Sequence, residues 1–117
     1  MNIKNNLSLF RHEIESASCK LIVVSKTHSS DKILEAYHSD QRVFGENKVQ
    51  EMVAKWELLP KDIQWHLIGH LQTNKVKYIA SLVSLIHSVD SQKLLEEINK
   101  QAKKVNRKIE CLLQVHI

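Results

Sequence analysis

The sequence predicts an α/β protein built on a parallel β-sheet. Short apolar runs, too brief for buried helices, begin near residues 21, 42, 64, 84 and 111. Segments with apolar residues at helical spacing separate them, and the period of about 20 to 27 residues is typical of repeated βα units. Regular βα alternation implies right-handed crossovers and parallel strands. A doubly wound sheet and a β/α barrel both satisfy this pattern.

The first half of the chain is predicted to hold a helix followed by two strand–helix pairs. The opening segment repeats apolar residues on one helical face, at Leu7, Phe10, Ile14 and Ala17. Leu21–Val24 is a continuous, mostly β-branched run, which is typical of a strand buried on both faces. Serines at 29 and 30 are suited to cap the next helix. A second strand covers Val43–Gly45, and Asn47 is the predicted N-cap of a helix that ends before Pro60.

The second half repeats the alternation. Its predicted elements are a strand at Gln64–His70, a helix from about Thr73 to Ala80, a strand at Leu85–Val89, a long helix from about Ser91 to Asn106, and a strand at Cys111–Val115. These make about four and a half βα units, whereas a complete barrel has eight units in roughly 250 residues. We therefore expect residues 1–117 to form a single domain that is the front part of a larger fold.

Composition narrows the class of protein. With 43% hydrophobic and 26% charged residues, the chain matches ordinary soluble globular proteins. No apolar stretch is long enough for a membrane span or a signal peptide. Two cysteines are too few for a disulfide framework. We expect a cytoplasmic protein with no membrane partner.

Two features suggest nucleic-acid or metal binding, and each has a simpler explanation. The net charge of +4 is concentrated at Lys100–Lys108, where cations complement the dipole at a helix C-terminus. His66 and His70 are four residues apart, but on a strand that spacing spans ~13 Å, too far to share one ion. We expect neither a nucleic-acid partner nor a metal site.

Polar residues follow the predicted strands at the edge where parallel sheets bind ligands. Lys26 comes just after the first strand, and both glycines of the protein, Gly45 and Gly69, lie at the same edge. A lysine there is either simply solvated or, in an apolar barrel mouth, a neutral amine that attacks an aldehyde. Asn47 and Ser88 are candidate ligand contacts and equally candidate helix caps.

Four segments in consecutive order resemble one family. They are Val24–Thr27, Phe44–Glu51, Trp65–Lys75 and Ile86–Ser91. Together they resemble the pyridoxal-phosphate homeostasis proteins, which are small single-domain relatives of the alanine racemase N-terminal barrel. The resemblance covers about residues 7 to 117. Any one segment alone is a weak indication, whereas four in register are specific.

The resemblance implies a fold type III β/α barrel of the TIM type, here a partial barrel preceded by an N-terminal helix. It implies pyridoxal 5′-phosphate as cofactor, with Lys26 matching the lysine of the internal aldimine and Asn47, His66, His70 and Ser88 as further cofactor-binding residues. The implied function is intracellular homeostasis or delivery of pyridoxal phosphate, with pyridoxal-phosphate-dependent apoenzymes as partners. We expect a carrier rather than a catalyst, and no catalytic residues are assigned.

The chain departs from the family pattern in two respects. Family members usually carry Gln-Val-Asn on the fifth strand, where this chain has Gln114, Val115 and His116. They are also about twice as long, and the missing half would hold the phosphate-binding loops. We therefore expect a truncated barrel with impaired cofactor retention that self-associates through exposed strand edges. Two alternatives stay open: a pyridoxal-phosphate-dependent amino-acid racemase, and a basic non-catalytic binding module.

Overall fold

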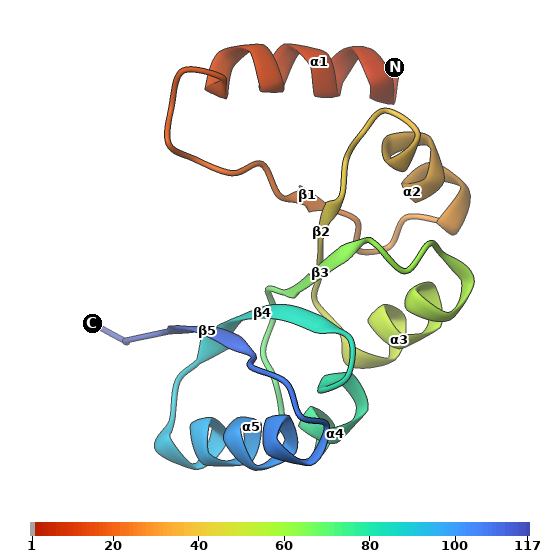
Figure 1. Cartoon of the computed structure of the whole chain (residues 1–117). Helices are drawn as coiled ribbons and strands as arrows, with labels where there is room; N and C mark the ends of the chain where they lie inside the picture. The colour runs from red at the N-terminus through yellow and green to blue at the C-terminus, as the bar shows by residue number, and fades with distance from the viewer. Residues whose placement is uncertain (1) are drawn as a thin grey trace.

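The computed structural model describes residues 2–117, which form a sheet of five parallel strands with helices between consecutive strands (Figure 1). In chain order the elements are α1 (Ile3–Ile14), β1 (Val23–Val24), α2 (Ser30–Tyr37), β2 (Val43–Glu46), α3 (Val49–Leu58), β3 (Gln64–Leu67), the 3-10 helix η1 (Thr73–Lys75), α4 (Val76–Ile79), β4 (Val83–Val89), α5 (Gln92–Lys104) and β5 (Glu110–Leu113).

Strand order distinguishes the two sheet architectures that the sequence left open. The strands are hydrogen-bonded in the order β1-β2-β3-β4-β5, and every neighbouring pair is parallel. A doubly wound sheet reverses its order at a switch point, whereas sequential order is that of a barrel wall. The described residues therefore form a partial β/α barrel, and the predicted fold class is confirmed.

The hydrophobic core lies between the sheet and the helices that follow its strands. Helices α2 to α5 lie along one face of the curved sheet (Figure 1). Alternate residues of the central strands point toward them: Phe44, Trp65 and Leu67 are fully buried. Met52 of α3 and Ile79 of α4 belong to the same cluster. Period-two alternation along the strands thus separates a covered face from an open face.

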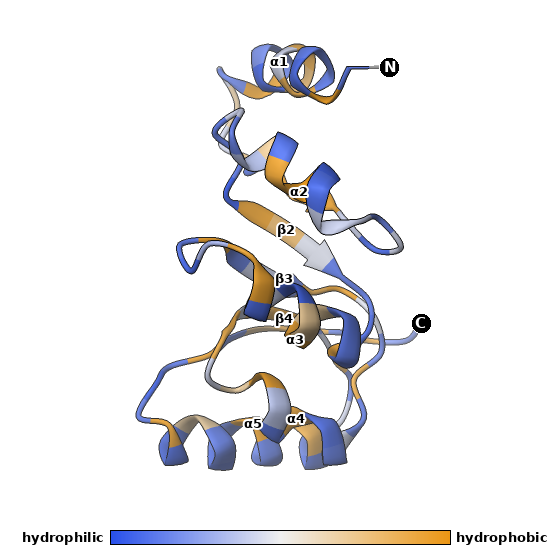
Figure 2. Cartoon of the chain, turned by 90° about the vertical axis from the view of Figure 1, so that its right-hand side faces the viewer, coloured by the Kyte–Doolittle hydropathy of each residue, from blue (hydrophilic) through white to orange (hydrophobic). Residues whose placement is uncertain are grey.

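Helix α5 forms where it is predicted, but it covers Gln92–Lys104 rather than about Ser91 to Asn106. Its buried residues are Leu94, Ile98 and Ala102, at helical spacing, and its side away from the sheet is hydrophilic (Figure 2). The Ser91 hydroxyl accepts a hydrogen bond from the Leu94 N–H at 3.1 Å, as expected of an N-cap. Beyond the helix, Arg107 donates to the Ala80 and Val83 carbonyls at 2.5 and 2.9 Å. One cation of the basic cluster therefore ties α5 to β4.

The structure differs from the sequence prediction at the N-terminal helix. Of the predicted apolar face of α1, only Leu7 is buried, Phe10 is 56% exposed, and Ala17 lies beyond the helix. The reason is that α1 packs mainly against α2, so one turn of the helix suffices for the contact. Arg11 fastens it by donating to the Ser39 carbonyl and to the Gln41 side chain.

Three strands are shorter than predicted. β1 covers only Val23–Val24, β3 ends at Leu67 rather than His70, and β5 ends at Leu113 rather than Val115. β1 pairs with β2 alone among the described residues. At the far edge, the segment after β5 is exposed, with Val115 79% accessible. Both outer strands of the sheet therefore present free edges within residues 2–117.

Candidate functional site

Lys26 lies in the first turn after β1, at the carboxyl edge of the sheet. The preceding residue, Ser25, still continues the strand ladder: its N–H donates to the Gly45 carbonyl at 3.0 Å. Ser25 is buried, whereas Lys26 is exposed and forms no ion pair within residues 2–117. The turn then closes with a hydrogen bond from the His28 N–H to the Ser25 carbonyl at 3.1 Å. The edge thus presents an unpaired amine on a short, hydrogen-bonded turn.

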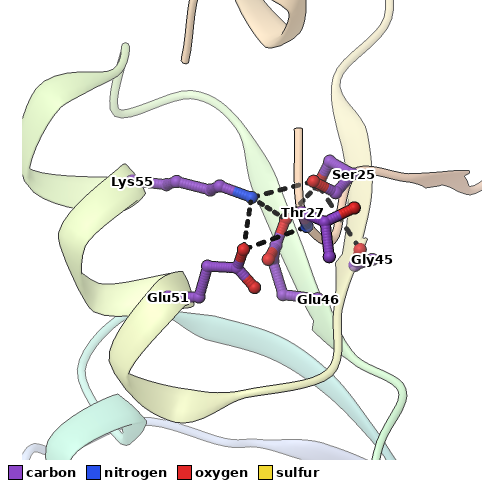
Figure 3. A network of polar contacts seen from close by, with 6 residues as sticks. All are labelled: Ser25, Thr27, Gly45, Glu46, Glu51 and Lys55. Carbon is purple, nitrogen blue, oxygen red and sulfur yellow. Dashed lines mark hydrogen bonds and ion pairs between the residues drawn. The ribbon is translucent and has the colours of Figure 1, made fainter. Parts of the chain in front are cut away.

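A buried network of charged and polar groups surrounds this turn (Figure 3). The Lys55 ammonium, reaching in from α3, donates to the Ser25 carbonyl at 2.8 Å and to Glu46 Oε2 at 2.9 Å. The Ser25 hydroxyl donates to the same Glu46 carboxylate. Glu51, one turn before Lys55 on α3, lies 3.5 Å from the ammonium and accepts the Thr27 N–H at 3.0 Å. One helix therefore holds the backbone on both sides of Lys26.

Burial and pairing act differently on the two carboxylates. Burial raises the pKa of Glu46 above its ordinary value, although the hydrogen bonds from Ser25 and Lys55 oppose that effect. Burial also acts to raise the pKa of Glu51, but the Thr27 N–H and the Lys55 ammonium outweigh it, and the net pKa is lowered. Glu51 therefore carries its charge under ordinary conditions, which strengthens its hydrogen bond to the Thr27 backbone.

Asn47 lies at the same edge but does not cap the helix, so the predicted N-cap is wrong. Helix α3 begins at Val49 and its cap position is Lys48, whose extended backbone (φ −117°, ψ 135°) sets the helix start without a side-chain cap bond. Asn47 is half-buried and lines a shallow pocket together with His70 and Lys75. Its side chain is therefore not used by the helix terminus.

Gly69 allows the backbone of two loops to come together at this pocket. A Cβ built on Gly69 would lie 2.6 Å from the Asn47 carbonyl oxygen and 2.9 Å from its Cα. Ser88, a buried residue of β4, donates from its hydroxyl to the Gly69 carbonyl at 2.6 Å. Asn47, His70 and Ser88 are thus brought together around Gly69, as expected of residues that end neighbouring parallel strands.

His66 lies deeper on the open face. The strand register places Val24, Gly45 and His66 at one level of the sheet, two residues before Lys26. There His66 Nδ1 is 3.1 Å from His87 Nε2. Burial, followed by the neighbouring His87 and Lys20, lowers the pKa of His66 to about 4; burial also lowers the pKa of His87. The two rings form a neutral pair that lies apart from the Asn47–His70 pocket.

The polar network around Lys26 was not predicted from the sequence. Two signals point to it in retrospect. Glu46 directly follows the apolar run Val43–Gly45 and is itself fully buried. Lys55 stands three residues after Met52, on the buried stripe of α3, and four after Glu51. A charged residue on a buried stripe indicates a partner on another element.

None of the helices within residues 2–117 combines the length and the apolar character that crossing a bilayer requires.

Comparisons with known proteins match nearly the whole chain. The family model described as "Alanine racemase, N-terminal domain" matches residues 1–117. A pyridoxal phosphate homeostasis protein of Aquifex aeolicus is 46% identical over 99 residues, which cover 84% of this chain and 43% of the relative. One from Schizosaccharomyces pombe is 38% identical over 120 residues, covering 97% of this chain and 51% of the relative. The chain spans about half the length of the curated relatives it matches.

Solved structures agree with the fold. PipY of Synechococcus elongatus PCC7942, with pyridoxal phosphate bound, superposes with a TM-score of 0.92 at 42% sequence identity. The match covers 98% of this chain and 55% of PipY. PipY without the cofactor gives the same TM-score at 41% identity.

Proposed function

The chain belongs to the alanine racemase N-terminal domain family, and we propose that it binds pyridoxal 5′-phosphate through Lys26 and serves in the homeostasis of that cofactor. The observation that carries the proposal is the unpaired Lys26 amine at the carboxyl edge of a parallel sheet, where such folds bind ligands. The names of the relatives and the cofactor-bound PipY support the choice of ligand.

The residues at this edge fit the cofactor. Ser25 is buried and donates to Glu46, whereas Lys26 follows it in the exposed turn at the carboxyl edge of the sheet. Asn47, His70 and Ser88 lie around Gly69 at the ends of the neighbouring strands. We propose Lys26 as the Schiff-base lysine, and Asn47, His70 and Ser88 as residues that orient the ring beside it. His66, one level deeper with His87, would contact the cofactor only from below.

The chain itself contributes an exposed amine at the carboxyl edge of the sheet. When bound, the cofactor would supply an aldehyde with which the Lys26 amine would form a reversible C=N bond, the carbonyl oxygen leaving as water. Lys26 makes no ion pair within the described residues, so no carboxylate competes with the cofactor for this side chain. The reverse reaction with water would release the cofactor for delivery to a pyridoxal-phosphate-dependent apoenzyme.

Reductive trapping tests the proposal. The chain is incubated with pyridoxal phosphate, reduced with borohydride so that a reversible C=N bond becomes a permanent C–N bond, and digested for peptide mapping. We expect the label on the peptide that contains Lys26 and its loss in Lys26→Ala. Lys48→Ala and Lys75→Ala serve as matched controls from the same edge and should keep the label on Lys26. Label centred on Lys48 or Lys75 would overturn the assignment.

We also propose that the free edges of β1 and β5 favour self-association. Val24 next to one edge and Leu113 on the other are 48% and 69% exposed, and unpaired strand edges are templates for pairing with another chain. Light scattering across a concentration series tests this: we expect the apparent mass to rise with concentration. A constant monomer mass together with a cooperative melting transition would contradict it.

A further inference from the structure

The residue after Lys26 has a backbone conformation that its side chain disfavours. Thr27 has φ 65°, in the left-handed region. The other non-glycine residues there are Asp40 and Asn106, types that tolerate it, whereas a β-branched residue does not. Such a conformation persists only where the surrounding structure imposes it, and it is enriched at functional sites. Something must therefore hold Thr27 in place.

Helix α3 supplies that restraint. The Thr27 N–H donates to Glu51 Oε1 at 3.0 Å, and the Ser25 carbonyl accepts from Lys55 Nζ at 2.8 Å. The two helical residues are one turn apart and also contact each other at 3.5 Å. Figure 3 shows both side chains reaching from the same helix to the turn. The residues on either side of Lys26 are therefore fixed by a single rigid element.

The same network fixes the neighbouring strand end. Lys55 donates to Glu46 Oε2 at 2.9 Å, and Glu46 immediately precedes Asn47. The Glu46 carbonyl in turn accepts the Ile68 N–H at 2.9 Å, next to Gly69. The Lys55 bonds to Ser25 and Glu46 thus fix the distance between the turn that carries Lys26 and the pocket at Asn47.

Stability alone is a weak explanation for this network. Replacing a buried ion pair with apolar residues of similar volume is often neutral or stabilising, because the desolvation of both charges offsets their attraction. The Glu46–Lys55 pair is buried within an otherwise apolar layer, and Glu46 Oε1 has no hydrogen-bond partner within the described residues. A role in fixing geometry accounts for charges that packing does not require.

We propose that Glu51 and Lys55 are positioning residues for the Lys26 amine, holding the turn that carries it through the Thr27 N–H and the Ser25 carbonyl. This inference rests on the proposed function. Side chains of α3 bind backbone groups of the turn, and in this way the helix would orient the Lys26 amine toward the aldehyde carbon.

The test compares three variants of the full 117-residue chain by borohydride trapping with pyridoxal phosphate. Glu51→Met removes the acceptor at similar side-chain length, and Glu51→Gln keeps an oxygen for the Thr27 N–H. Glu57→Met is the matched control, because Glu57 lies exposed on the same helix and makes no ion pair within residues 2–117. We expect the initial rate of Lys26 labelling to fall about tenfold in Glu51→Met, the loss typical of a charged hydrogen bond. It should stay within about threefold of wild type in Glu51→Gln and be unchanged in Glu57→Met.

A second measurement does not depend on any variant folding. Amide hydrogen exchange on the unmodified chain reports the Thr27 N–H directly, and we expect it to be protected relative to the exposed Lys26 N–H in the same turn. A Thr27 amide that exchanges as fast as that of Lys26 would overturn the proposal. A Glu51→Met variant that melts cooperatively and is labelled on Lys26 at the wild-type rate would also overturn it.

The experiment separates failure of this inference from failure of the proposed function. If Lys26→Ala leaves trapping unchanged, the cofactor assignment fails whatever Glu51 does. If Lys26→Ala abolishes trapping while Glu51→Met does not slow it, the cofactor assignment stands and the positioning role fails.

Discussion

The two faces of the sheet carry buried polar pairs of opposite kinds. On the covered face, Lys55 and Glu46 form an ion pair under the helices, with the ammonium donating to two oxygens. On the open face, His66 and His87 form a ring–ring contact at 3.1 Å, and burial lowers the pKa of both. In the first pair, hydrogen bonds from Ser25 and Lys55 oppose the rise that burial causes in the pKa of Glu46. In the second pair, burial disfavours the charged form of both rings.

The difference shows how this sheet separates positioning from ligand access. The Lys55 and Glu46 charges on the covered face are buried away from any ligand. Their effect on the site is through the backbone of the turn, which Lys55 binds. The open face has no helical layer (Figure 1), and its buried pair consists of two imidazoles rather than of an ion pair. Changes on the covered face should therefore alter stability and geometry, whereas those on the open face should alter pH dependence and surface properties.

The largest effect is expected from breaking the covered pair. Lys55→Met leaves the fully buried Glu46 carboxylate without its cation, and removing one partner of a buried pair costs about 3–5 kcal/mol of unfolding free energy. Urea denaturation measures it. The double variant Lys55→Met/Glu46→Leu should recover most of the loss, since it removes both charges. If Lys55→Met costs less than about 1 kcal/mol, then water reaches the Glu46 carboxylate and the pair is not buried as described.

The next effect concerns the open-face pair and pH. The pKa of His66 is about 4 in the folded chain against an ordinary value of 6.5, so the unfolded chain takes up the proton first as the pH falls. His66 should therefore reduce stability as the pH decreases from about 6.5 to about 4, by on the order of 3 kcal/mol.

Comparison with a variant isolates the histidine. Glu46 has a raised pKa and acts in the opposite sense at low pH, so the informative quantity is the difference between wild type and His66→Gln at each pH. We expect that difference to grow in favour of the glutamine variant as the pH falls, measured from urea midpoints. A difference independent of pH would show that the imidazole is not desolvated.

A smaller effect is expected where the loops of the carboxyl edge meet. Gly69→Ala places a methyl group 2.6 Å from the Asn47 carbonyl oxygen, and backbone must move. We expect a loss of about 1–3 kcal/mol. Gly45→Ala is the matched control: its nearest neighbours are the side-chain ends of Ile68 at 3.1 Å and Ile22 at 3.3 Å, which can shift. Equal melting temperatures for the two variants would contradict the close packing of Gly69 on Asn47.

Sequence patterns predicted the helices and strands, whose residues repeat at a fixed period. They did not predict side-chain contacts between elements that are far apart in the sequence. The βα alternation and the clustering of Asn47, Gly69 and Ser88 follow from the order of the elements. The cap of α5 was predicted at the wrong residue, because Ser88 was the candidate and Ser91 is the N-cap. The Lys55–Ser25 bond joins residues 30 apart, so the place of Lys55 on the buried stripe of α3 indicates a partner without identifying it.

The His66–His87 contact was equally hidden. After a register shift between Trp65 and His66, the β3–β4 pairing sets His66 opposite Leu85, and His87 lies two residues further along β4. No turn residue or apolar period in the sequence marks that shift. The prediction for Asn47 failed for a related reason, because the helix start was set by the backbone of Lys48 rather than by a capping side chain.

The smallest effect is expected from an apolar residue of the open face. Leu112 of β5 is 49% exposed, whereas Leu67 on the covered face of β3 is fully buried. Leu67→Ala should cost about 2–5 kcal/mol of unfolding free energy because it leaves a cavity. Leu112→Ala should cost less than about 1 kcal/mol because only about half of the Leu112 side chain is buried. Urea denaturation of both variants at low protein concentration gives the comparison. If Leu112→Ala is as costly as Leu67→Ala, then another surface covers the open face in solution. A cost that appears only at high concentration would identify that surface as a second copy of the chain.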